Sequence, residues 1–150
     1  MTKFKKLLII FLVICLTTGI LWLYWESEFT LEGHLPDENW YKIQLHGVYF
    51  KSYVEYTVEE ATVPLLLDML QTAKVDRGPK FETLDGDALI LWLYPGEKPP
   101  TQITVRADGR ISVMAELRDK RVRYYEGGEA LYCQLQTTAL SLPAYQHIGQ

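Results

Sequence analysis

The sequence predicts an α+β protein in which a single N-terminal transmembrane helix is followed by a mainly antiparallel sheet with two helices. Three observations predict this class. Residues 7–25 form one long apolar run, several later segments favour β-strand residues, and two segments carry apolar residues at helical spacing. Beyond the apolar run, the expected order of elements is β-β-α-β-β-β-β-α.

The apolar run, residues 7–25, contains no charged side chain. As a helix it reaches about 28 Å, close to the thickness of the hydrocarbon layer of a lipid bilayer. The lipid bilayer is therefore the expected partner of residues 7–25. Residues 1–6 contain three lysines. Lysines beside a span stay in the cytoplasm, so these residues are the expected cytoplasmic tail and the C-terminal domain is expected outside. Trp22, Tyr24 and Trp25 suit the outer interface.

A cleaved signal peptide is the alternative to an uncleaved signal-anchor. Thr17, Thr18 and Gly19 are the candidate small residues for a cleavage site. The chain stays apolar from Ile20 to Trp25, whereas a signal peptide is polar near its cleavage site, so the uncleaved anchor is favoured. Cleavage would instead release a secreted ligand-binding protein.

Charge and cysteine content limit what the outer domain can be. It holds all 19 acidic residues and 12 of the 15 basic ones, a formal charge of −7, which argues against a nucleic-acid partner. Cys133 is its single cysteine, so no disulfide forms within the domain and the fold depends on its apolar core. The short tail, together with the lack of a disulfide pair and of a glycosylation sequon, favours a bacterial source.

The outer domain is expected over residues 41–140, after a juxtamembrane linker at residues 26–40 that has no clean period. Apolar and polar residues then alternate from Tyr41 to His46, which predicts a half-buried strand that Gly47 ends. Val48 to Tyr56 is rich in aromatic and β-branched residues and predicts a second strand.

A helix is predicted next, because the period changes to that of a helix at Val63, Leu66, Leu67, Leu70 and Ala73. Two starts are open. Thr62 can cap the helix with Pro64 in its first turn, where a missing N–H costs nothing. Alternatively, Thr57 and Glu60 form a capping box, which would place Pro64 inside the helix.

The second half of the domain is predicted to contain a central strand followed by three more strands. After a polar loop at Asp76–Asp87, the seven apolar residues of Ala88–Tyr94 predict a strand buried on both faces. Asp108-Gly109 is a hairpin signal between strands at Ile103–Val105 and Ile111–Ala115. A turn at residues 118–120 precedes a short strand over residues 122–125.

The chain is predicted to end in a helix and a tail. Leu131, Leu135 and either Thr138 or Ala139 follow Gly127-Gly128 at helical spacing. Residues 141–150 read as a frayed C-terminal tail.

The central strand offers a candidate partner site. If Leu89, Leu91 and Leu93 face the core, then the opposite face carries three large side chains, Ile90, Trp92 and Tyr94. Cover by the second helix is the favoured reading, since large exposed apolar patches are uncommon on monomers. The other reading is an aromatic patch that docks an unknown protein partner or a second copy of the domain.

A second candidate is an anion-binding patch formed by Arg106, Arg110, Arg121 and Arg123. These arginines gather on the outer face of the sheet if Ile111 and Val122 turn inward. Lipid headgroups or anionic wall polymers could pair with such a patch. A solvated strand face is the plainer reading and the favoured one.

Catalysis has no motif in this sequence, and no cofactor or metal is expected. The three histidines share no metal-ligand spacing, and Asp85 with Asp87 lacks the further oxygen ligands of a calcium loop. The rival to a non-enzymatic interaction or sensing module is therefore a membrane-tethered hydrolase in which Asp85, Asp87 and His46 converge.

Overall fold

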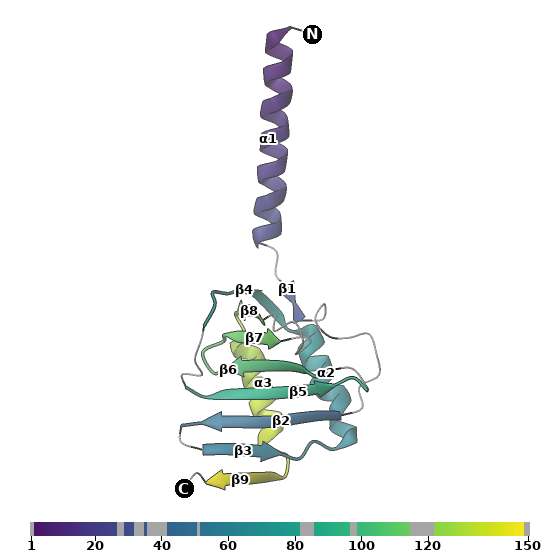
Figure 1. The fold of residues 1–150 in the computed structure, drawn as a ribbon, viewed down its shortest axis with the longest axis vertical. Helices are drawn as coiled ribbons and strands as arrows, with labels where there is room; N and C mark the ends of the chain where they lie inside the picture. Colours follow the sequence, from purple (N-terminus) through teal and green to yellow (C-terminus); the bar gives the residue numbers. More distant parts are fainter. Residues whose placement is uncertain are drawn as a thin grey trace.

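The computed structural model describes residues 2–26, 29–31, 35, 42–50, 52–81, 86–96, 99–114 and 122–148. Its first element, α1 (Lys3–Glu26), stands away from the rest of the chain in Figure 1. Within the described ranges, one helix is long and apolar enough to cross a membrane: Lys3–Leu23, with mean hydropathy 2.4 and no part buried. An apolar helix that packs against nothing is typical of a membrane anchor or a signal sequence.

The predicted α+β class is confirmed, because the apolar helix is followed by an antiparallel sheet and two helices. Among the described residues, nine strands follow one another across the sheet in the order β1-β4-β8-β7-β6-β5-β2-β3-β9. Their bounds are β1 Phe29–Thr30, β2 Lys42–Tyr49, β3 Ser52–Tyr56, β4 Lys74–Arg77, β5 Ala88–Tyr94, β6 Thr101–Arg106, β7 Ile111–Met114, β8 Val122–Glu126 and β9 Ala144–Ile148. Two helices, α2 (Val63–Thr72) and α3 (Glu129–Leu140), complete the fold.

The core lies between one face of the sheet and these two helices. Both α2 and α3 run behind the sheet in Figure 1, on the same side. Leu91 on the central strand β5 is fully buried with Leu66 of α2 and Leu135 of α3. Each of these side chains removes its whole apolar surface from water, worth roughly 1.5–3 kcal/mol.

The strand β2 continues through Gly47, so the prediction that this glycine ends the first strand is wrong. Gly47 pairs with Val54 on one side and with Leu89 on the other. A Cβ at this position would meet the ring of Tyr49 at 2.6 Å. The glycine is therefore needed because the Tyr49 ring lies across it, and not because the chain turns there.

The start of α2 lies near Thr62, as the first of the two predicted alternatives has it. A 3₁₀ turn, Glu60–Thr62, precedes the helix, and Pro64 lies in its first turn. Thr62 occupies the cap position but makes no side-chain hydrogen bond there. The 3₁₀ turn begins the helical path at Glu60 without placing the proline inside the helix.

The hairpin between β6 and β7 is confirmed. Gly109 has φ +84°, which glycine adopts without strain, and its N–H donates to the carbonyl of Arg106 at 3.0 Å. β8 and α3 also follow the predicted segments. The turn expected at residues 118–120 lies outside the described residues.

Three predicted coil segments contain strands instead, one of which is the linker at residues 26–40 with the two-residue β1. Residues 144–148, expected in a frayed tail, form β9, which pairs along its length with β3. The polar segment after α2 begins with β4, which pairs with β8 and with the two-residue β1. Most of the expected linker at residues 26–40 lies outside the described residues.

The order of strands sets the distance of each strand from α1. β1 starts three residues after α1 ends, within about 11 Å of it. At about 4.8 Å per strand, the central β5 lies roughly 24 Å along the sheet from β1, and β9 lies at the opposite edge. The two chain ends accordingly lie at opposite ends of the molecule (Figure 1).

Candidate interaction surface

One face of the sheet packs on the two helices, and the other face has no described helix over it (Figure 1). We call the second one the open face. Its side chains come from alternate positions of the central strands, which the registers place side by side: Lys42, Gln44, His46, Val48, Tyr53, Glu55, Ala88, Ile90, Trp92, Tyr94, Gln102, Thr104, Arg106, Ser112 and Met114.

The three candidate residues of β5 lie on this open face. Ile90, Trp92 and Tyr94 are half-buried, while the leucines between them are fully buried under the helices. The favoured expectation that the second helix covers them is therefore wrong. Each has polar neighbours across the sheet, such as His46 beside Ile90. The open face is a mosaic of apolar and polar groups and not a bare aromatic patch.

Trp92 has a glutamine on each side. It is the direct register partner of Gln44 on β2 and of Gln102 on β6. The hydroxyl of Tyr94 donates to Oε1 of Gln44 at 2.9 Å. Nε2 of Gln102 donates to the hydroxyl of Thr104 at 3.4 Å. Neither glutamine is among the residues predicted from the sequence, although each alternates with apolar neighbours on its own strand.

Next to this row, His46 and Tyr53 form a stacked pair. Their ring centroids are 5.3 Å apart, and the Tyr53 hydroxyl lies 2.5 Å from Nδ1 of His46. Burial lowers the pKa of His46, and the nearby carboxylate of Glu55 opposes this less strongly. Burial also raises the pKa of Tyr53. Both shifts favour the neutral forms of the two side chains, which a hydrogen bond between the phenol and Nδ1 of the imidazole joins.

Two of the four candidate arginines lie together, at the β6–β7 turn. Arg106 and Arg110 both contact Oδ2 of Asp108, at 3.0 and 3.1 Å. Both guanidinium groups also lie over the ring of Phe81, at 5.4 and 5.8 Å from its centroid. Asp108 offsets part of their charge, and Arg106 is almost fully buried. Asp108 and Phe81 of the same domain thus hold both guanidinium groups in place.

Arg123 lies on the other face of the sheet and does not join this cluster. Val122 pairs with Met114 and is 37% exposed on the open face, so the expectation that it turns inward is wrong. Arg123 pairs with Val113, which places it on the face that carries the helices. Arg121 lies outside the described residues.

Two residues of the rival hydrolase, His46 and Asp87, lie on opposite faces of the sheet and do not converge. His46 lies on the open face and contacts Tyr53. Asp87 instead accepts a hydrogen bond from the Phe50 N–H at 3.3 Å. It also lies near the core-side Tyr132, whose pKa is raised by burial and, less strongly, by this carboxylate. Asp85 lies outside the described residues. Within the described ranges, no group of three or more His, Cys, Asp or Glu side chains could hold a metal ion.

A buried tyrosine cluster lies near Asp87, at one end of the core. The hydroxyls of Tyr49 and Tyr56 are 2.8 Å apart, and burial raises the pKa of Tyr49. The Tyr132 hydroxyl is buried without a hydrogen-bond partner among the described residues. The cluster joins the first turn of α3, which carries Tyr132, to strands β2 and β3.

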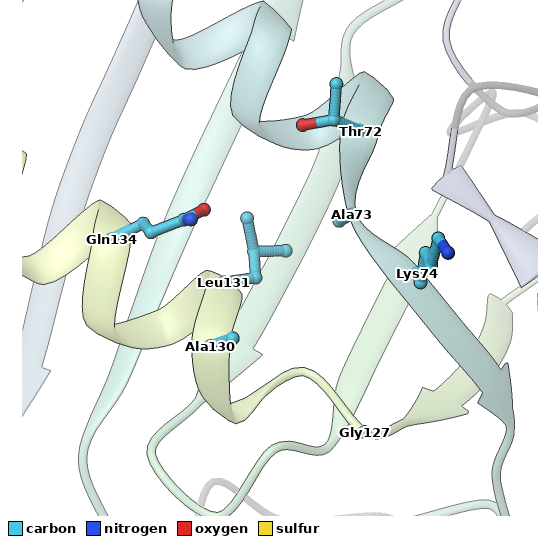
Figure 2. Close-up of a pocket in the computed structure, with 7 residues that line it drawn as sticks. All are labelled: Thr72, Ala73, Lys74, Gly127, Ala130, Leu131 and Gln134. Atoms are coloured by element: carbon cyan, nitrogen blue, oxygen red, sulfur yellow. The ribbon is translucent and has the colours of Figure 1, made fainter.

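A cavity of about 200 Å³ lies on the helix side of the sheet. Figure 2 shows it between the end of α2, the start of β4 and the first turns of α3. Its lining residues are Thr72, Ala73, Lys74, Gly127, Ala130, Leu131 and Gln134. None of the candidate residues from the sequence lies in this lining.

Comparisons with known proteins add no relative. No protein-family model, no curated protein and no solved structure matches this chain. Function is therefore inferred from the N-terminal helix and from the residues of the open face.

Proposed function

We propose that this chain is a membrane-anchored interaction or sensing module that receives its partner on the open face around Trp92 and Tyr94. One observation carries the proposal: both helices pack on one face of the sheet, and the central strand presents half-exposed aromatic side chains on the other. Tryptophan and tyrosine suit partner sites because each combines a large apolar body with a polar tip.

The site lies well away from the anchor. Trp92 is on β5, roughly 24 Å along the sheet from the strand that follows α1. A partner that reaches it comes from the aqueous phase and not from the lipid headgroups. The lysines of residues 1–6 support a cytoplasmic N-terminus, and with it an extracytoplasmic domain.

The interaction site is tested by crosslinking in intact membranes, followed by mass spectrometry of the captured neighbours. The full chain is compared with the double variant Trp92→Ala, Tyr94→Ala. A matched control, Leu65→Ala with Leu140→Ala, removes exposed apolar side chains from the helix side, where they are 49% and 72% exposed. We expect the open-face variant to lose at least one neighbour that the control keeps. A folded open-face variant that keeps every neighbour would sink the proposal.

The location is tested separately. Intact-mass analysis of the mature chain distinguishes an anchor that retains residues 7–25 from a protein cleaved near Gly19. A mature chain that begins after Gly19 would make this a secreted ligand-binding protein. Labelling of Cys133, which is exposed on α3, with a membrane-impermeant thiol reagent reports the side on which the domain lies.

A further inference from the structure

The registers of three neighbouring strands bring Gln44, Trp92 and Gln102 into one lateral row. We propose that this Gln–Trp–Gln row binds a sugar ring of a neutral glycan. The inference rests on the proposed function above and names the chemical class of the partner. It is carried by the placement, polarity and charge of the row.

The row has the shape of a platform with two polar sides. Residues directly opposite one another in antiparallel strands have Cβ atoms about 5 Å apart, so one amide flanks Trp92 on β2 and another flanks it on β6. All three side chains are half-buried, which restrains them while leaving part of each open to solvent. A ligand that lies on the indole is therefore within reach of both amides.

This combination matches the chemistry of a sugar. A pyranose ring presents C–H groups on its faces and hydroxyls around its rim. The indole face is broad, apolar and electron-rich, and it packs against such C–H groups. A glutamine amide both donates and accepts hydrogen bonds, as a hydroxyl needs. None of the three side chains in the row is ionisable, which suits a neutral ligand.

The two amides are partly preorganised. The Tyr94 hydroxyl donates to Oε1 of Gln44, and the N–H₂ of the same amide has no hydrogen-bond partner among the described residues and is not buried. The bond from Gln102 to Thr104 is long, at 3.4 Å, so this amide can exchange it for a ligand hydroxyl. Orientation before binding reduces the entropy lost when a ligand binds.

The pattern around the row favours a glycan over the apolar core of a protein interface. Ile90 is flanked by His46 and Thr104, just as Trp92 is flanked by its two glutamines. Each large apolar side chain at these positions thus has polar neighbours on both sides, which interrupts any continuous apolar patch. Protein interface cores are instead apolar and continuous.

Binding is tested with the full chain in detergent micelles on an array of neutral and acidic oligosaccharides, followed by calorimetric titration of the best neutral binder. We expect Trp92→Leu to weaken binding by about tenfold and Trp92→Phe by a few-fold at most, since only an aromatic ring retains the stacking. Gln44→Ala and Gln102→Ala should each weaken it about fivefold. Phe50→Ala, at an 85% exposed aromatic in the β2–β3 turn, is the matched control and should bind normally.

The outcomes separate this inference from the proposed function. An array with no neutral binder, or equal binding by Trp92→Leu and the unchanged chain, overturns the glycan inference. If the double variant at Trp92 and Tyr94 still loses a crosslinked protein neighbour, the proposed function stands and its partner is a protein. Comparable thermal unfolding of the leucine and phenylalanine variants excludes misfolding as the cause of a difference between them.

Discussion

Leu91 and Trp92 are neighbours on β5, yet their replacement by alanine should have very different effects on stability. Leu91 is fully buried between the sheet and both helices. Its loss removes apolar contacts and leaves a cavity, so Leu91→Ala should lower the free energy of unfolding by about 3 kcal/mol. Trp92 faces the other way, is half-buried, and has Gln44 and Gln102 as its cross-strand neighbours. Trp92→Ala should therefore cost about 1 kcal/mol.

Urea unfolding of the full chain in detergent micelles, followed by far-ultraviolet circular dichroism, measures both values. In a thermal experiment the Leu91 variant should lose about 10 °C and the Trp92 variant only a few degrees. Leu93→Ala, at another fully buried position of the same strand, should resemble Leu91→Ala. Equal losses for Leu91→Ala and Trp92→Ala would refute the assignment of one packed and one open face.

Three further predictions concern the pH dependence and the glycines. Burial lowers the pKa of His46 below 6.5, so the unfolded chain binds a proton at this imidazole more readily than the folded chain does. The free energy of unfolding should therefore fall as pH drops below about 6.5. His46→Gln should flatten that part of a pH series of unfolding free energies. Gly47→Ala pushes the Tyr49 ring away from its position and should cost about 1–3 kcal/mol, with the cost reduced when Tyr49→Leu is added; thermal unfolding measures both. Gly78→Ala places a Cβ 2.7 Å from the backbone of Tyr125 and should cost about 2 kcal/mol or more, with faster amide exchange in β4; unchanged exchange there would contradict the packing of β4 on β8.

The elements that could be predicted from the sequence are those whose residues carry a local signal. β5 matches its predicted bounds because seven apolar residues in succession form a buried strand. The β6–β7 hairpin follows from Asp108-Gly109, and α3 from helical spacing after two glycines. In each case, neighbouring residues in the chain determine the local conformation.

The edge strands could not be predicted, because pairing with distant segments forms them. β4 buries only Val75 among its four residues, so it has the composition of a loop. β9 follows Pro143 and pairs with β3, about ninety residues earlier in the chain. Its Tyr145 is 67% exposed, so no apolar alternation marks the strand.

The candidate site was predictable in part. Alternation along β5 places Trp92 and Tyr94 on one face, but the helices that cover the other face are positioned by tertiary packing. The flanking glutamines depend on the registers of β2 and β6 against β5. The register also explains the error at Arg123, since a shift of one residue moves every side chain of a strand to the opposite face.

Photo-crosslinking from single positions tests most directly whether the open face receives the partner. A photoreactive benzophenone side chain is placed at Trp92, or at the exposed Leu65 on α2, in the full chain in intact membranes. Benzophenone inserts into C–H bonds, so it captures protein and glycan neighbours alike, and mass spectrometry distinguishes them. We expect a discrete adduct from position 92 that position 65 does not give. No adduct from position 92, or the same adducts from both positions, would contradict the account.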